Sequence, residues 1–393
     1  MNITTGQFND SYFPIMDGVG MTAHNYARWL NEKYGISMVV APKVDKYVDK
    51  VSYKVYRFKS VILPGMNPYR VGLPQIDFKF KKNIRKIGFD LVHAHCPFIS
   101  GHMALKVAAN LDIPLVTTFH SKYRDDFKKV INNDHFADFL VKMTLDFYNS
   151  ADMVWVPNKA TGLTLQQYGY KGSYEVMPNG TDMAIPDKFK LISLRKKGLK
   201  MIKAGPDEFV MLFVGQHRWE KNLRLIIDAL KLVKENGNSF KMVFAGEGYA
   251  AADMKKLVLK YNLQENVVFL GVLTDRNELQ HVFAASDLFI FPSVYDNSPL
   301  VIQEAAAFDV PSIVVRNSSS AENILEGVNG FLVENESADL AKKMIALMMD
   351  QHAIKKAGEG ARKSIYHPWE LIIDDVYIRY TDLIKDHKRV HSK

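Results

Sequence analysis

Two carboxylates beside a predicted strand-to-helix junction are the residues in this sequence best placed to do chemistry. Asp296 and Glu304 stand eight positions apart, shortly after an apolar strand predicted over Leu288–Phe291. We expect Asp296 on a loop and Glu304 inside the following helix, so that they contact different parts of one ligand. A loop that opens a helix leaves backbone N–H groups without intrahelical acceptors, which attracts phosphate. Because Pro299 has no N–H, the predicted donors are Ser298, Leu300 and Val301.

The alternative is that both acids are ordinary surface residues at the edge of a helix. The spacing alone favours that alternative, because short motifs often match by chance. The flanking residues favour a functional site instead. Pro292 and Ser293 follow the strand directly, Ala305 follows Glu304, and the apolar run Gly330–Val333 comes later.

With these neighbours, residues 291–330 resemble the acid–seven–acid signature of the retaining glycosyltransferases of family 4, which have the two-domain GT-B fold. The resemblance implies that Asp296 contacts hydroxyls of the donor sugar and that Glu304 contacts the ribose of the nucleotide. The family usually has Glu at the first position. Asp is one methylene shorter, so the resemblance leaves the donor sugar open.

Further motifs of the same family follow in the expected order. A strand over 209–214 leads to Gly215 and then Lys221, where the resemblance implies contact with the donor diphosphate. Gln216 stands at the usual Arg position, and Arg218, two residues on, could supply the missing charge. The other contacts to the donor implied by the resemblance are Gly246 at a strand-to-helix corner, and Val272 and Leu273 against the nucleobase.

The first half carries a glycine pair and a strand-end histidine. Gly18 and Gly20 precede a helix predicted over Met21–Lys33, and they could be a plain turn or a close approach to an anion. The resemblance implies the second, with contact to the donor diphosphate, although the match is partial. His120 ends a strand predicted over 113–120. It could simply cap that strand, but the resemblance implies contact with the donor sugar near its 6-hydroxyl.

His93 and His95 lie on one face of another predicted strand, since side chains alternate along a strand. A metal site would need further ligands, and no Cys, His or acid cluster stands near them in the sequence. The chain also has no Asp-x-Asp. We therefore predict metal-independent chemistry without a cofactor. The resemblance gives the catalytic set as Asp296, Glu304, His120 and Lys221, with His93 and His95 shaping the cleft.

Strands alternate with helices through both halves, which predicts two doubly wound α/β domains. The resemblance implies GT-B architecture: two Rossmann-like domains facing a central cleft, and a C-terminal helix crossing back to the first. An amphipathic helix predicted over Trp369–Lys388 could do so. The predicted divisions are an acceptor-side domain over 1–187, a lysine-rich linker or short exposed helix within 188–206, a donor domain over 207–366, and the tail 367–393.

Charge is spread unevenly along the 393 residues. Residues 1–200 hold 28 Lys and Arg against 17 acids, a net +11, whereas the rest of the chain is −3. A basic first half suggests an anionic partner. A helix predicted over Pro74–Gly88 has Ile76 on its apolar stripe and Lys79, Lys82 and Lys86 on the opposite side. We predict peripheral contact with an anionic membrane through these lysines and the segment 122–131. The alternative is a solvated basic face. Nucleic acid is excluded because no reader motif organises these cations.

The functional hypothesis is a retaining glycosyltransferase that moves a hexose from a nucleotide-diphosphate sugar, UDP-glucose or similar, to a lipid or glycan. The resemblance extends to bacterial enzymes that glucosylate diacylglycerol or build capsular polysaccharide. The alternatives are a sugar-nucleotide epimerase of GT-B architecture and a non-catalytic nucleotide-sugar binder. A single cysteine, Cys96, and an N-terminus without a signal-peptide pattern favour the cytoplasm. The predicted lipid contact would place the chain at the inner face of the plasma membrane.

Overall fold

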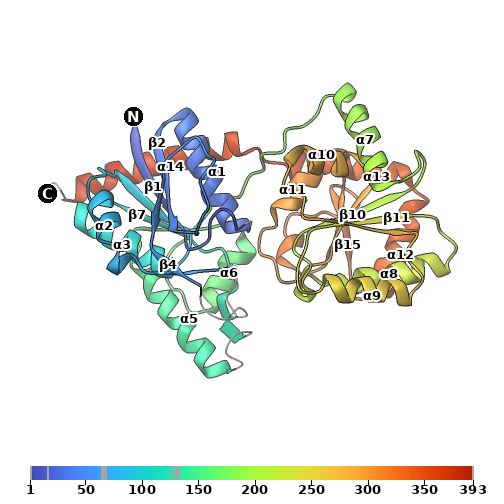
Figure 1. The fold of residues 1–393 in the computed structure, drawn as a ribbon, viewed down its shortest axis with the longest axis horizontal. Helices are drawn as coiled ribbons and strands as arrows, with labels where there is room; N and C mark the ends of the chain where they lie inside the picture. The colour runs from blue at the N-terminus through green and yellow to red at the C-terminus, as the bar shows by residue number, and fades with distance from the viewer. Residues whose placement is uncertain (1, 16, 63–68, 125–126, 129–132, 392–393) are drawn as a thin grey trace. The chain divides into compact units, whose positions relative to one another are not determined.

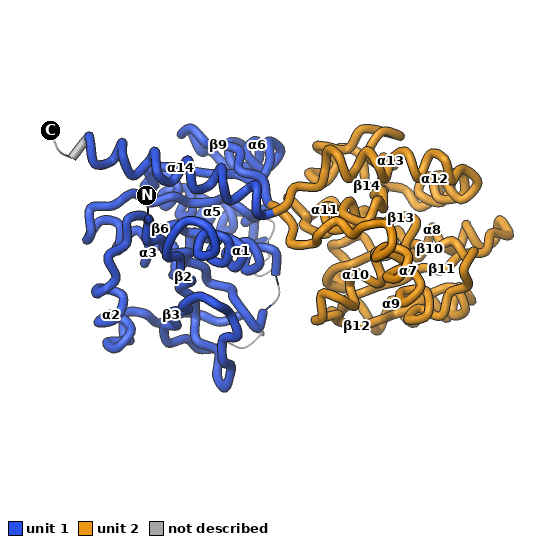
Figure 2. The backbone as a smooth tube through the Cα atoms, turned by 90° about the horizontal axis from the view of Figure 1, so that it is seen from above, with its two compact units in different colours: residues 1–179, 369–393 blue, residues 180–368 orange. Residues whose placement is uncertain are grey.

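The computed structural model describes residues 2–15, 17–62, 69–124, 127–128 and 133–391. The chain divides into two compact units, coloured separately in Figure 2. Unit 1 comprises Met1–Asn179 and Trp369–Lys393, and unit 2 comprises Gly180–Pro368. The boundary between them thus falls at residue 179, eight residues before the predicted end of the first domain.

Unit 1 is built on a seven-stranded sheet in the order β3-β2-β1-β6-β7-β8-β9, in which every pair is parallel. A two-stranded antiparallel ribbon lies apart from it. The strands are β1 Ile3–Phe8, β2 Gly35–Pro42, β3 Val55–Phe58, β4 Ser60–Val61, β5 Val71–Gly72, β6 Leu91–Ala94, β7 Leu115–Thr118, β8 Met153–Val156 and β9 Glu175–Val176. The helices are α1 Gly18–Lys33, η1 Pro74–Ile76, α2 Phe78–Ile84, α3 Ile99–Leu111, α5 Asp134–Asn149, α6 Lys159–Gln167 and α14 Trp369–His391.

Unit 2 has a six-stranded parallel sheet in the order β12-β11-β10-β13-β14-β15, with helices on both of its faces (Figure 1). The strands are β10 Val210–Val214, β11 Lys241–Ala245, β12 Val267–Gly271, β13 Leu288–Phe291, β14 Ser312–Val315 and β15 Gly330–Val333. The helices are α7 Lys188–Ile202, η2 Trp219–Lys221, α8 Leu223–Glu235, α9 Ala251–Lys260, α10 Arg276–Ala285, α11 Leu300–Ala306, η3 Ser319–Ala321, α12 Ser337–Met348 and α13 Gln351–Ser364.

Both units therefore have the doubly wound architecture predicted from the sequence. In each sheet the strand order reverses beside the first strand, between β1 and β6 in unit 1 and between β10 and β13 in unit 2. Ligands of such sheets bind outside the carboxyl ends of the strands at this switch point. The loops that follow these four strands are accordingly the places to look for a site.

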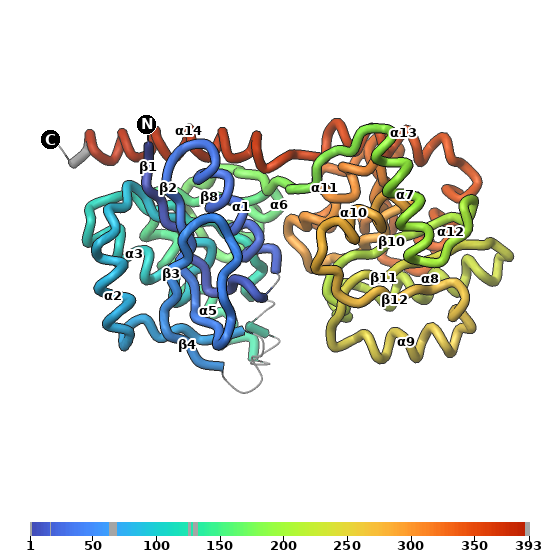
Figure 3. Tube along the Cα trace, turned by 45° about the horizontal axis from the view of Figure 1, so that its top comes forward, coloured from blue at the N-terminus to red at the C-terminus, as the bar shows by residue number. Residues whose placement is uncertain are grey.

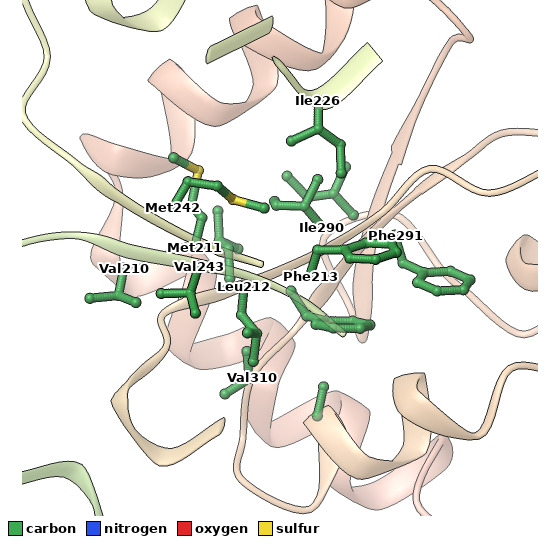
Figure 4. Packing of buried hydrophobic residues seen from close by; sticks show 14 of the residues in the cluster. Val210, Met211, Leu212, Phe213, Ile226, Met242, Val243, Ile290, Phe291 and Val310 are labelled. Carbon is green, nitrogen blue, oxygen red and sulfur yellow. The ribbon is translucent and has the colours of Figure 1, made fainter. Parts of the chain in front are cut away.

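The central strands of unit 2 are apolar on both faces because helices cover both sides of a parallel sheet. All the side chains of 210–213 and of 288–291 are buried. Figure 4 shows this packing, with Ile226 of α8 and Val310 among the neighbours of the strands. The buried strands give the loops at their carboxyl ends a rigid base.

The C-terminal helix α14 belongs to unit 1, as predicted, and runs along it in Figure 3. Its apolar stripe is buried against unit 1. Tyr380 stacks on Trp155 with ring centroids 5.4 Å apart, and Tyr377 stacks on Tyr34 at 3.9 Å. The buried residues of the stripe are Trp369, Ile372, Ile373, Val376, Tyr380 and Ile384.

Two predicted helices have different bounds in the structure. Helix α1 begins at Gly18, three residues before the predicted start at Met21, because Asp17 caps it through the backbone N–H of Gly20. The predicted helix over 74–88 is a short 3-10 turn followed by α2, which Asp77 caps and which ends at Ile84. Ile76, assigned to its apolar stripe, is instead exposed.

The range 188–206 was predicted as a linker or a short exposed helix, and most of it forms helix α7, which packs on α10. Leu194, Gly198 and Ile202, four residues apart, are buried in this contact. A Cβ at Gly198 would lie only 1.9 Å from the carbonyl oxygen of His281, so glycine is what lets the two helices approach. The lysines on the other face of α7 obscured this pattern in the sequence.

Candidate functional site

Lys221 and Asp296 meet at the switch point of unit 2. Lys221 ends the loop after β10, and Asp296 lies on the loop after β13. The Lys221 ammonium forms an ion pair with the Asp296 carboxylate and lies 5.8 Å from the centroid of the Phe291 ring. The Ser293 hydroxyl donates to the other Asp296 oxygen over 2.5 Å. Two residues predicted to bind different parts of a donor are therefore neighbours, each held in place.

Asn222 ties the two loops together. Its backbone is left-handed, with φ of 62°, which Asn tolerates better than most residues. Its side-chain amide donates to the Pro292 carbonyl at 3.2 Å and to Asn335 at 2.6 Å. The loop that carries Lys221 is thus fixed against the start of the loop that carries Asp296.

Glu304 lies inside α11, as predicted, and is only 7% exposed. The Arg276 guanidinium donates to Glu304 Oε1 at 2.8 Å and also pairs with Asp182. Burial raises the pKa of the Glu304 carboxyl, and the Arg276 charge opposes that shift. Because Arg276 engages Oε1, a ligand hydroxyl would donate to Oε2.

Arg276 and Asp182 were missed as site residues by the sequence analysis. Arg276 is the first residue of α10, and Asp182 lies in the extended segment before α7, 94 positions away. Asp182 ends the stretch Pro178-Asn179-Gly180-Thr181-Asp182, which resembles a Pro-Asn-Gly-x-Asp motif of the family and could have indicated it. No local pattern distinguishes Arg276 from a surface cation.

Helix α11 begins at Leu300, and no side chain caps its N-terminus. Ser298, Leu300 and Val301, the predicted amide donors, are half-buried around this first turn. The contact of these amides with a phosphate stays a prediction. What the structure shows is that the helix start and Lys221 both adjoin the loop that bears Asp296.

Gln216, at the usual Arg position of the family, and Arg218, the proposed replacement, differ in their surroundings. Gln216 is exposed, and its carbonyl accepts the backbone N–H of Arg218 at 2.9 Å. The Arg218 guanidinium lies 3.4 Å from Glu220, whose carboxylate also accepts from Tyr249. Both cations are therefore paired with an acid, Arg218 with Glu220 and Lys221 with Asp296.

Gly246 and Gly248 serve loop packing. Gly246 has φ of +136°, and a Cβ there would lie 1.9 Å from the carbonyl oxygen of Gly215. A Cβ at Gly248 would lie 2.4 Å from the carbonyl oxygen of His217. The pair therefore lets the loop after β11 lie directly on the loop that leads to Lys221. Val272 and Leu273 follow β12, the former exposed and the latter half-buried.

In unit 1 three histidines gather at the carboxyl ends of β6 and β7. The rings of His93 and His95 stack with centroids 4.2 Å apart, and His95 Nδ1 lies 3.3 Å from His120 Nε2. His95 Nε2 faces the amide oxygen of Gln7 at 3.0 Å, so its proton is on Nε2 and Nδ1 accepts from His120. His93 contacts the Tyr380 hydroxyl at 2.5 Å.

Burial lowers the pKa of all three histidines, that of His120 to about 3. They are therefore neutral at pH 7 and can donate or accept hydrogen bonds without carrying charge. His120 is the half-buried member of the group, and the other two are fully buried. Such an arrangement positions a neutral imidazole at the strand ends.

The glycine pair of unit 1 lies within the first turn of α1. The Gly20 N–H donates to Asp17 Oδ1 at 2.7 Å, and Ser11 donates to the same carboxylate. Burial raises the pKa of Asp17. An anion approaching Gly20 would therefore meet a carboxylate, while a Cβ at Gly18 would meet no heavy atom within 4 Å. Contact of Gly18 and Gly20 with a diphosphate stays a prediction.

Each half of the chain matches a known family model. Residues 16–185 match "Glycosyltransferase Family 4", and residues 198–364 match "Glycosyl transferases group 1". Alpha-monoglucosyldiacylglycerol synthase of Acholeplasma laidlawii is 24% identical over 99% of both chains. The Streptococcus pneumoniae enzyme of the same name is 24% identical over 89% of this chain and 80% of its own.

Solved structures agree in fold. Sucrose-phosphate synthase from Thermosynechococcus elongatus superposes with a TM-score of 0.80 at 18% identity, covering 98% of this chain and 100% of that one. Anabaena HepE in complex with UDP-glucose gives 0.77 at 18% identity, covering 97% and 100%. At this identity the likeness establishes the GT-B fold and nothing finer.

Proposed function

The chain belongs to the family 4 glycosyltransferases of GT-B fold, and we propose that it is a retaining enzyme that moves a hexose from a nucleotide-diphosphate sugar to a lipid or glycan. The observation that carries the proposal is the arrangement of Lys221, Asp296 and Glu304 at the switch point of unit 2. Glucose is the proposed sugar, with UDP-glucose as its donor, and diacylglycerol is the first acceptor to test, because two relatives are named alpha-monoglucosyldiacylglycerol synthase.

The reaction breaks the bond between the anomeric carbon and the diphosphate, which gathers negative charge on the leaving group. Lys221 and the amides at the start of α11 would stabilise that charge, the kind of preorganised electrostatic contact that is usually the largest catalytic term. The acceptor oxygen bonds to the anomeric carbon on the same face, its proton passes to the departing phosphate, and the nucleoside diphosphate leaves. Neither Asp296 nor Glu304 transfers a proton in this scheme.

The ion pairs of the site have a consequence for binding. Asp296 neutralises Lys221, so the donor diphosphate must replace that carboxylate on the ammonium. The released Asp296 can then accept from sugar hydroxyls. Glu304 keeps Arg276 on Oε1 and accepts from the ribose at Oε2. Donor binding thus replaces the Lys221–Asp296 ion pair by two contacts to the donor, one from Lys221 to the diphosphate and one from Asp296 to the sugar.

The proposed peripheral membrane contact rests mainly on α2. Lys79 and Lys82 are exposed on this helix, and Lys86 is exposed two residues after its end. Phe78, the first residue of the helix, is 78% exposed. Segment 122–131 contributes less than expected, because two of its cations pair with acids of α5. Residues 125–126 and 129–131 of that segment lie outside the described residues. Among the helices of the described chain, none is long and apolar enough to cross a bilayer.

The experiment is a thermal-shift screen of UDP- and GDP-sugars, followed by transfer assays with the best donor. Diacylglycerol presented in anionic vesicles should become labelled with the sugar, and the nucleoside diphosphate should be released. A donor that stabilises the protein but yields no acceptor product, with the free donor itself altered, would contradict transfer and favour an epimerase. A donor that stabilises the protein but is neither transferred nor altered would favour a non-catalytic nucleotide-sugar binder.

A further inference from the structure

Helix α7 of unit 2 presents an exposed face that combines apolar and cationic side chains. Phe189 is 86% exposed and Ile192 is 60% exposed, and Ile185, just before the helix, is 43% exposed. From Lys188 to Lys203 the sequence holds seven Lys and Arg residues and no acid. Large exposed apolar side chains grouped within a basic rim mark an interaction surface.

The opposite face of α7 is firmly anchored. Leu194 and Ile202 are buried against unit 2, and Gly198 allows close contact with α10. The Arg195 guanidinium donates to the Ala285 carbonyl at 3.1 Å and pairs with Asp287 at 3.1 Å. Phe189 and Ile192 are therefore held outward on a fixed helix and are not part of a fraying end.

The geometry points to one occupant: we propose that α7 docks in the plane of an anionic lipid surface. Helices that lie in a membrane interface place aromatic and aliphatic side chains below the headgroups and lysines beside the phosphates. Phe189 lies at the centre of the exposed face, and Lys196 and Lys200 follow on the same side at helical spacing. The apolar side chains then contact acyl chains, and the lysines contact phosphates.

Other occupants satisfy only part of this face. A soluble polyanion would pair with the lysines but leave Phe189 and Ile192 in water. A second copy of α7 would cover the apolar residues but bring seven cations against seven. An anionic bilayer supplies both acyl chains and phosphates. The proposed contact belongs to unit 2 and rests on residues other than those of α2 in unit 1.

A site-specific label on the full chain tests this face. In a Cys96→Ser background, which removes the single cysteine, Phe189→Cys carries an environment-sensitive dye. Met349→Cys, at a position 81% exposed in the same unit, is the matched control. With anionic vesicles at low salt, the dye at 189 should shift to the blue and gain protection from an aqueous quencher. The dye at 349 should not respond, and neutral vesicles or high salt should abolish the response.

Binding of the unlabelled protein supplies the second measurement. The double change Phe189→Ser with Ile192→Ser should weaken vesicle binding about tenfold, since both side chains would sit in the interface. The same double change at Leu259 and Met349 should leave binding unaltered. If the protein floats with anionic vesicles while the dye at 189 stays silent, the proposal is wrong and another surface docks. A dye response to a soluble polyanion, or to protein concentration alone, would equally overturn it.

Discussion

Replacing Arg276 by Met should give the enzyme a new dependence on pH. Glu304 is buried, and its carboxyl pKa is raised by desolvation and held down mainly by Arg276. Of the other groups facing it, Asp182 raises the pKa further. Without the guanidinium, Glu304 takes up a proton at higher pH and loses its acceptor role toward the ribose. A charge-assisted hydrogen bond is worth about 1.5–3 kcal/mol, so donor kcat/KM should fall roughly 10- to 150-fold.

The assay is kcat/KM for the donor across the pH range, in wild type and variant. The Arg276→Met profile should fall as pH decreases through a higher midpoint than in wild type. Adding Glu304→Gln should remove this new limb, and Arg276→Lys should restore part of the activity. Arg316→Met, which breaks an exposed pair with Glu334 in the same unit, is the matched control. A variant profile parallel to wild type would refute the coupling between Arg276 and Glu304.

Four further predictions concern single features of the site and the core. Lys221→Ala should reduce kcat/KM more than Arg218→Ala, because Lys221 contacts the loop of Asp296, where the donor is proposed to bind, whereas Arg218 pairs with its near neighbour Glu220; the reverse order in steady-state assays would make Arg218 the main diphosphate contact. Asp296→Asn should bind free UDP more tightly than wild type by calorimetry while losing turnover of the UDP-sugar, because no carboxylate then competes for Lys221; weaker UDP binding would contradict this exchange. Activity should survive EDTA, and a loss restored by magnesium or manganese would refute the metal-free scheme. Burial lowers the pKa of His217, so the unfolded chain binds the proton more readily and stability should fall below about pH 6.5. Among the described residues neither His217 ring nitrogen has a hydrogen-bond partner, so His217→Leu should raise the unfolding free energy by about 1–3 kcal/mol and reduce its acid sensitivity in thermal melts.

The fold and the placement of the two acids could be predicted because both depend on local patterns. Alternating strands and helices determine a doubly wound sheet, and the apolar strand before Asp296 indicates a loop and then the helix that holds Glu304. The returning C-terminal helix was predictable from its apolar stripe. Each of these features depends on residues that lie close together in the sequence.

What could not be predicted depends on contacts between distant residues. The Arg276–Asp182 pair joins positions 94 apart, and a single sequence holds no sign of it. The same holds for Lys221 on Asp296, which are 75 apart. The packing of helix α7 was not predicted, for a different reason. Its lysines outweighed a buried stripe of only three residues, one of them a glycine whose role is visible only beside α10.

The central claim is sugar transfer with retention from the site at Lys221, Asp296 and Glu304. The most direct measurement is a proton NMR time course with an α-linked UDP-sugar and diacylglycerol in anionic vesicles, run for wild type and Glu304→Ala. We expect an α-anomeric glycolipid to grow with the release of UDP in wild type, and almost none in the variant. A β-anomeric product, an altered free donor without glycolipid, or full activity in Glu304→Ala would contradict the account.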